Sequence, residues 1–105
     1  MKALLFATHG DTNVLQYTET KDPQARADDA IVRVHASALN RIDVIQRAGT
    51  YTVPGFKLPH IGGLDIAGEI VYLGANAAKS SSWQIGDRVV VNPSLSNVSA
   101  ASTLC

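Results

Sequence analysis

The stretch LPHIGGLDIAGEIVYLG, residues 58–74, joins closely spaced glycines to an apolar run that carries two carboxylates, Asp65 and Glu69. The run DIAGEIVYLG is bounded by turn residues and predicts a strand. Glycine lets a backbone turn and lets neighbouring segments approach closely, as the crowded wall of a small barrel requires. Because Asp65 lies among apolar neighbours, we expect it to find backbone amides or a basic group as hydrogen-bond donors.

Other segments on both sides of this stretch also predict short strands. KALLFA (residues 2–7), AIVRVHASAL (30–39) and IGDRVVVNP (85–93) are largely apolar, the last two with several β-branched residues, and a Gly-Asp pair marks the turn into the last of them. TNVLQYTET (12–20) alternates weakly and predicts a further short strand, which would make an early antiparallel meander. The polar segment ANAAKSSSWQ (75–84) predicts a loop.

The segment NRIDVIQRAG, residues 40–49, has a different period. Ile42, Ile45 and Gln46 fall at i, i+3 and i+4, which is typical of one face of a helix. Asn40 stands at the position of an N-cap, with Asp43 three residues later in the first turn. The pattern predicts a short helix that ends at Gly49.

Many short strands with one or two helical turns favour a mainly β fold, a small and partly open barrel. The 105 residues suit one compact domain. Nine basic and nine acidic side chains cancel without a basic stripe, so we expect no nucleic-acid or membrane partner. The N-terminal apolar run is too short for a secretion signal, and we expect a cytoplasmic location. One cysteine, Cys105, excludes an internal disulfide framework.

Three separated motifs, ALNRIDVIQRAGTY, GGLDIAGEIVYLG and WQIGDRVVVNP, occur in an order and spacing that resembles a known family. The chain is similar to the N-terminal GroES-like domain of medium-chain alcohol dehydrogenases and quinone oxidoreductases. The resemblance implies a substrate domain over residues 1–93, with a partly open β-barrel that packs against a nicotinamide-binding Rossmann domain. Residues 94–105 form a Ser/Ala-rich tail.

The sequence has no signature of the Rossmann domain itself. Gly62, Gly63 and Gly68 do not make a Gly-x-Gly-x-x-Gly spacing, and no parallel βαβ unit is predicted around them. We therefore expect this chain alone to bind neither NADPH nor NADH tightly. It is interpreted either as a fragment of a longer enzyme, which we favour, or as a stand-alone form of the domain.

The resemblance also bears on zinc. Zinc-dependent relatives place a Cys at the start of the helix, a hydroxyl residue two positions on, and a His-Glu pair in the glycine cluster. The matching positions here are Asn40, Ile42, Leu64 and Asp65. Leu64 has no lone pair and Asn40 is a poor zinc ligand, so no catalytic zinc is expected. The three histidines lie on separate segments without ligand spacing.

Many relatives also carry a lobe of four cysteines for structural zinc. The corresponding positions in the tail are Asn97, Ala100 and Thr103, which leaves Cys105 alone. Because one thiolate cannot build a closed tetrahedral site, we expect the lobe to be lost or cut away.

Zinc-lacking relatives keep an Asn-x-x-Asp, an Arg-x-Gly-x-Tyr and an acid in the glycine cluster, and this chain matches them at Asn40, Asp43, Arg47, Gly49, Tyr51 and Asp65. The resemblance implies hydride transfer from NADPH to a quinone or enone, with the Asn40 amide and the Tyr51 hydroxyl as donors to the substrate oxygen.

Structural alternatives remain for each of these residues. Asn40 and Asp43 can simply cap the helix, Tyr51 can pack at a loop edge, and Arg47 is expected to be solvated or ion-paired. For Asp65 an organising role in the cleft is favoured over proton donation.

Two functions of different class follow. The first is the substrate domain of an NAD(P)H-dependent oxidoreductase acting on a carbonyl, quinone or enone, inactive alone. The second is a non-enzymatic binding or self-associating module that reuses the barrel, as a homo-oligomer. Both predict exposed apolar side chains where another surface would cover the domain.

Overall fold

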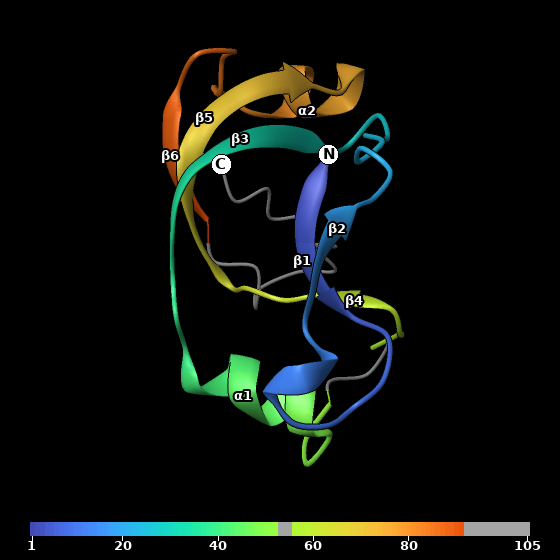
Figure 1. Ribbon diagram of the computed structural model, residues 1–105. Helices are drawn as coiled ribbons and strands as arrows, with labels where there is room; N and C mark the ends of the chain where they lie inside the picture. The colour runs from blue at the N-terminus through green and yellow to red at the C-terminus, as the bar shows by residue number, and fades with distance from the viewer. Residues whose placement is uncertain (53–55, 92–105) are drawn as a thin grey trace.

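Six strands form two three-stranded antiparallel sheets in the computed structural model, which describes residues 1–52 and 56–91. In the first sheet the strand order is β2-β1-β4, and in the second it is β3-β5-β6. The two sheets face each other, with helix α1, Arg41–Ala48, at one end of the molecule and helix α2, Ala75–Ser80, at the other (Figure 1). This arrangement confirms the predicted mainly β, partly open class. The tail at residues 94–105 lies outside the described residues.

The first sheet is built on β1, Lys2–Phe6, whose Ala3 and Phe6 side chains are buried. On one edge it pairs with β2, Gln16–Glu19, and on the other with β4, His60–Ile61, at the end that holds α1 (Figure 1). The prediction of a strand over 2–7 is confirmed.

Of the meander predicted for the first three strands, the antiparallel pairing of β1 with β2 is confirmed, and the place of the third strand is wrong, because β3 joins the other sheet. Only the second half of residues 12–20 is a strand. The first half is a 3-10 helix, Thr12–Val14, which the Asp11 side chain caps by accepting the Thr12 N–H at 2.8 Å.

The second sheet pairs β3, Ala30–Ala38, with β5, Asp65–Leu73, along almost their whole length. Val34, Ile66 and Ile70 are its buried side chains. The short strand β6, Arg88–Val91, which the sequence predicted as a strand, lies on the other side of β5. Two register shifts, at Ile31/Val32 and Val34/Ala36, interrupt the β3–β5 ladder, and both strands curve strongly (Figure 1).

The glycine cluster contains both kinds of structural glycine that the sequence predicted. A Cβ on Gly68 would lie 2.1 Å from the carbonyl oxygen of Arg33 in β3, so the two strands approach too closely for any side chain there. Gly63 has φ +110°, a conformation that side chains rarely adopt. Gly62 has neither constraint.

The loop predicted over residues 75–84 contains a helix, α2, Ala75–Ser80. This short segment is rich in alanine, which favours helix, and its first turn is held by another segment. The backbone N–H groups of Asn76 and Ala77 donate to the carbonyl oxygen of Ala27 at 2.9 and 3.0 Å. A local pattern cannot reveal this partner, because Ala27 lies far away in the sequence. In the described part of the chain, no helix is long and apolar enough to cross a membrane.

The Gly68→Ala variant tests the close approach of β3 and β5. The added methyl group has no room beside the Arg33 carbonyl, so we expect the free energy of unfolding to fall by about 3 kcal/mol. Gly62→Ala is the matched control and should change it by less than about 0.5 kcal/mol, since no atom lies within 4 Å of the added Cβ. Urea unfolding measures both, and equal effects would contradict this account.

Candidate functional site

Asn40 lies between the end of β3 and the start of helix α1, Arg41–Ala48. It is the N-cap, with extended backbone angles, and its Oδ1 accepts the backbone N–H of Ile42 at 3.2 Å. Gly49 ends the helix in the left-handed conformation, with φ +82°. The predicted start and end of the helix are therefore confirmed.

Asp43 completes a capping box with Asn40. Its Oδ2 accepts the backbone N–H of Asn40 at 2.9 Å. The Asn40 side chain thus caps the backbone of the first turn, and the Asp43 side chain holds the backbone of Asn40 in return. The other oxygen, Oδ1, is buried and has no hydrogen-bond partner among the described residues. Asp43 thus anchors the backbone of Asn40 with one oxygen and leaves the second unsatisfied.

Asp65 joins this group from the first position of β5. The Asn40 side-chain nitrogen Nδ2 lies 3.5 Å from Asp65 Oδ2, a long hydrogen bond in which the amide donates. The contact follows from the sheet, since Ala38 and Asp65 are register partners in the β3–β5 ladder. Because Oδ1 of Asn40 is held by the helix, its Nδ2 is turned toward the carboxylate.

The environment predicted for Asp65 was wrong in two respects. Its donor is the Asn40 amide, where the sequence predicted a backbone amide or a basic group. Its side chain is also exposed, because Asp65 begins β5 on the face opposite the buried Ile66. Water therefore hydrates the carboxylate, and its apolar neighbours in sequence do not surround it.

Tyr51 and Arg47 do not belong to the hydrogen-bonded group. Tyr51 follows the end of α1, is 55% exposed and makes no hydrogen bond within residues 1–52 and 56–91. Arg47 was expected to be solvated or ion-paired, yet its Nε donates to the carbonyl oxygen of Gly10 at 3.2 Å. Since Gly10 N–H donates in turn to the Arg47 carbonyl at 2.9 Å, Arg47 fastens the loop after β1 to α1.

A cluster of four rings, which the sequence did not predict, packs beside α1. It consists of Phe6, His9, Phe56 and His60, with ring centroids 4.5 Å apart for Phe56 and His60 and 5.5 Å apart for Phe6 and His60. His9 Nδ1 lies 2.9 Å from the carbonyl oxygen of the buried Gln46 in α1. Partial burial lowers the pKa of His60 below its usual value of 6.5, and the negative charge of Asp43 offsets part of that effect.

No local pattern could have revealed this cluster. Phe6 and His60 are brought together by the pairing of β1 with β4, two strands far apart in the chain. Within the described ranges, no three His, Cys, Asp or Glu side chains gather as a metal site would require.

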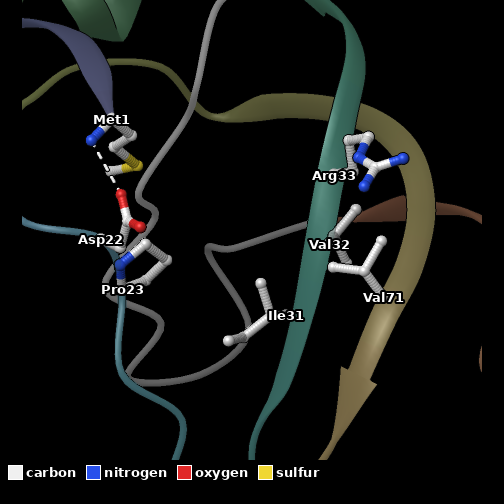
Figure 2. Close-up of a pocket in the computed structure, with 7 residues that line it drawn as sticks. All are labelled: Met1, Asp22, Pro23, Ile31, Val32, Arg33 and Val71. Carbon is white, nitrogen blue, oxygen red and sulfur yellow. Dashed lines mark hydrogen bonds and ion pairs between the residues drawn. The ribbon is translucent and has the colours of Figure 1, made fainter.

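A pocket of about 290 Å³ lies between the start of β1 and strands β3 and β5, away from these residues. Figure 2 shows its lining. The Met1 amino group, hydrogen-bonded to Asp22, lies on one side, and Ile31, Val32 and Val71 lie on the other. Because none of the predicted site residues lines it, the candidate site is the Asn40–Asp43–Asp65 group at the start of α1.

Comparisons with known proteins agree on one family. The model of the alcohol dehydrogenase GroES-like domain matches residues 26–105. The chain is 33% identical, over 90% of its length, to an NADPH-dependent alkenal/one oxidoreductase of Arabidopsis thaliana, and 34% identical, over 84%, to a quinone oxidoreductase of Pseudomonas aeruginosa. It spans 24% and 26% of those proteins.

Solved structures give the same result. The quinone oxidoreductase of Escherichia coli, crystallised with NADPH, superposes with a TM-score of 0.75 at 30% identity. The match covers 86% of this chain and 26% of that one.

The Asn40→Ala variant tests the cap. It removes the acceptor of the Ile42 N–H, and we expect the free energy of unfolding to fall by about 1 kcal/mol. Asn40→Ser keeps an oxygen that can cap and should recover most of this loss. Urea unfolding compares the three proteins, and an alanine variant as stable as the parent would show that the cap adds nothing.

Proposed function

The chain belongs to the alcohol dehydrogenase GroES-like domain family, and from this premise we propose that it forms the substrate-binding part of an NAD(P)H-dependent oxidoreductase that reduces quinones or enones. The names of the relatives support the substrate class, since they include a quinone oxidoreductase and an alkenal/one oxidoreductase. Because the chain spans about a quarter of those proteins, the activity is proposed for the complete enzyme.

The observation that carries the proposal is the orientation of the Asn40 amide. Its oxygen is committed to the Ile42 N–H, and its nitrogen is turned away from the helix toward Asp65. An amide nitrogen carries two hydrogens, so a second N–H remains to donate to a substrate oxygen. When a hydride adds to an enone or quinone, negative charge develops on that oxygen, and a fixed donor stabilises it.

In this proposal the two carboxylates are positioning residues. Asp65 holds the amide nitrogen of Asn40, while Asp43 holds its backbone N–H at 2.9 Å. A side chain that is hydrogen-bonded at its oxygen, at its nitrogen and at its backbone loses little conformational freedom when it binds a substrate. Such preorganised donors lower the activation barrier.

Tyr51 is the proposed second donor. The residue is 55% exposed and its hydroxyl makes no hydrogen bond within the described part of the chain, so it is available to a substrate. It lies two residues after Gly49, at the C-terminal end of the helix that Asn40 begins. A phenol can donate a proton to the developing oxyanion in addition to the amide.

The residues of this chain do not fit NADPH by themselves. The strand β5 that carries the glycine cluster is antiparallel to both of its neighbours, whereas a dinucleotide site needs a parallel βαβ unit with a Gly-x-Gly-x-x-Gly turn. NADPH supplies a hydride when bound. We assign its binding to another part of the complete enzyme.

Exposed apolar side chains beside the site support the proposal that another part of the enzyme covers this surface. Leu39, which directly precedes Asn40, is 98% exposed, and Val44 on α1 is 51% exposed. Large apolar groups at this level of exposure are usual where a second surface packs. The remainder of an oxidoreductase would both cover them and exclude water from the Asn40 amide.

The proposal is tested by joining this chain to the cofactor-binding remainder of the Pseudomonas aeruginosa quinone oxidoreductase in place of its own matching segment. We expect the chimera to oxidise NADPH when a quinone is added, and the 105-residue chain alone to show no such activity. Asn40→Ser should lower kcat/KM of the chimera by about 10²- to 10³-fold, the usual effect of removing one donor to an oxyanion.

The control for Asn40→Ser is Asn76→Ser, the same change on an exposed residue of α2, at the far end of the molecule from α1 (Figure 1). It should leave kcat/KM unchanged. Full reductase activity of the isolated chain, or an Asn40→Ser chimera as active as its parent, would overturn the proposal and favour a non-enzymatic module.

The Asp65→Asn variant of the chimera separates positioning from proton donation. The variant keeps an acceptor oxygen but loses the negative charge. Because the bond from the Asn40 amide is long and exposed, a loss of about 0.5 kcal/mol should lower kcat only about two-fold at every pH. If Asp65 instead donates a proton, one limb of the pH profile of kcat will disappear in the variant. Urea unfolding serves as the control for a general loss of stability.

A further inference from the structure

The C-terminal end of helix α1 is capped by a segment that lies far away in the sequence. The carbonyl oxygens of Gln46 and Arg47 belong to the last turn, and the helix ends before any further helical N–H group could bond to them. Nδ1 of His9 lies 2.9 Å from the Gln46 oxygen, and the backbone N–H of Gly10 donates to the Arg47 oxygen at 2.9 Å. The loop after β1 thus supplies the donors that this end of the helix needs.

The contact with Gln46 fixes the tautomer of His9. A carbonyl oxygen can only accept a hydrogen bond, so in the neutral imidazole Nδ1 carries the proton and Nε2 does not. The ring of Phe56 lies nearly parallel to the imidazole, with the ring centroids 5.7 Å apart and the planes 20° apart. His9 is therefore held at one nitrogen by α1 and on its ring by an aromatic neighbour.

The ring of His9 also lies against Gly49, the residue at which the chain leaves α1. A Cβ at Gly49 would lie 2.6 Å from Cγ of His9, so the imidazole occupies the space that a side chain would take. The N–H of Gly49 donates to the Ile45 carbonyl at 3.0 Å, and φ is +82°. The direction in which the next residues run is thus set at the point where His9 contacts the backbone.

Tyr51 follows two residues after this contact. It is 55% exposed, and it makes no hydrogen bond within residues 1–52 and 56–91. Because no hydrogen bond of its own fixes Tyr51 there, its position depends on the backbone that leads to it from the end of α1.

We propose that His9 is a positioning residue for Tyr51: its Nδ1–H caps the end of α1, and its ring fixes the turn at Gly49 from which the segment with Tyr51 begins. Without this donor the last turn of the helix frays and Tyr51 moves more freely. The consequence for catalysis rests on the proposed function, in which the Tyr51 hydroxyl donates to the substrate oxygen. The consequence for the conformation of the chain does not.

The conformational part is tested by NMR on the 105-residue chain in mildly alkaline solution. Long-range nitrogen–proton correlations should place the proton of His9 on Nδ1. His9→Phe keeps an aromatic ring and removes the donor, so we expect the amide order parameter of Tyr51 to fall from about 0.85 toward about 0.6. His9→Asn places an amide N–H at the position of Nδ1 and should restore the order parameter of the parent chain.

The matched control is His35→Phe, the same change at an exposed position of β3, which should leave the order parameter of Tyr51 unchanged. A proton on Nε2 of His9, or a Tyr51 amide that is as well ordered in His9→Phe as in the parent chain, would overturn the proposal. If His9→Phe does not fold, His9→Leu replaces it, because leucine has the shape of asparagine without its donor.

The catalytic part is tested in the chimera. His9→Phe should lower kcat about five-fold, the effect of one ordinary hydrogen bond, and leave KM unchanged, because a donor to the developing oxyanion acts in the transition state. His9→Asn should restore kcat. In a chimera that already carries Tyr51→Phe, His9→Phe should lower kcat no further, since the hydroxyl that it positions is absent.

The double variant separates positioning from a general loss of stability. If His9→Phe lowers kcat equally with and without the Tyr51 hydroxyl, His9 does not act through Tyr51 and the proposal is overturned. An inactive chimera would contradict the proposed function, and the order parameter of Tyr51 in the chain alone would still decide the role of His9.

Discussion

The antiparallel pairing of β3 with β5 is the constraint on which the rest of the structure depends. The two strands approach so closely at Gly68 that the Arg33 carbonyl occupies the space of a side chain. Their register places Ala38 opposite Asp65, and Asn40 follows two residues later. The acid of one strand therefore lies beside the residue that starts the helix after the other, although 25 positions separate them in the chain.

Asn40 shows that capping and chemistry need not compete for one side chain. The carbonyl oxygen of its amide satisfies the helix, and the nitrogen at the other end remains a donor. A helix N-terminus needs an acceptor and a developing oxyanion needs a donor. In the proposed function the amide can serve both, whereas an ionised aspartate could serve only the first. The structural and functional interpretations of Asn40 are thus compatible.

The predictions that rest on the strongest local patterns of the sequence were correct. The helix over residues 40–49 was predicted together with its cap, its first-turn acid and its final glycine, because each is a contact between neighbours in the chain. The long strands were also correct, since their apolar runs are continuous. Helix α2 was missed because the carbonyl that holds its first turn belongs to Ala27, and β4 because two residues carry no period.

The sequence by itself determined the mainly β class and the family, because these depend on local patterns and on motif spacing. Only the tertiary structure decided the orientation of the candidate site residues and their contacts with one another. It turned Asp65 outward beside Asn40, left Tyr51 apart from the group, and packed the ring of His60 against Phe6 and Phe56. Each of these relations requires strand pairing between distant segments, and a one-dimensional pattern does not contain the register of that pairing.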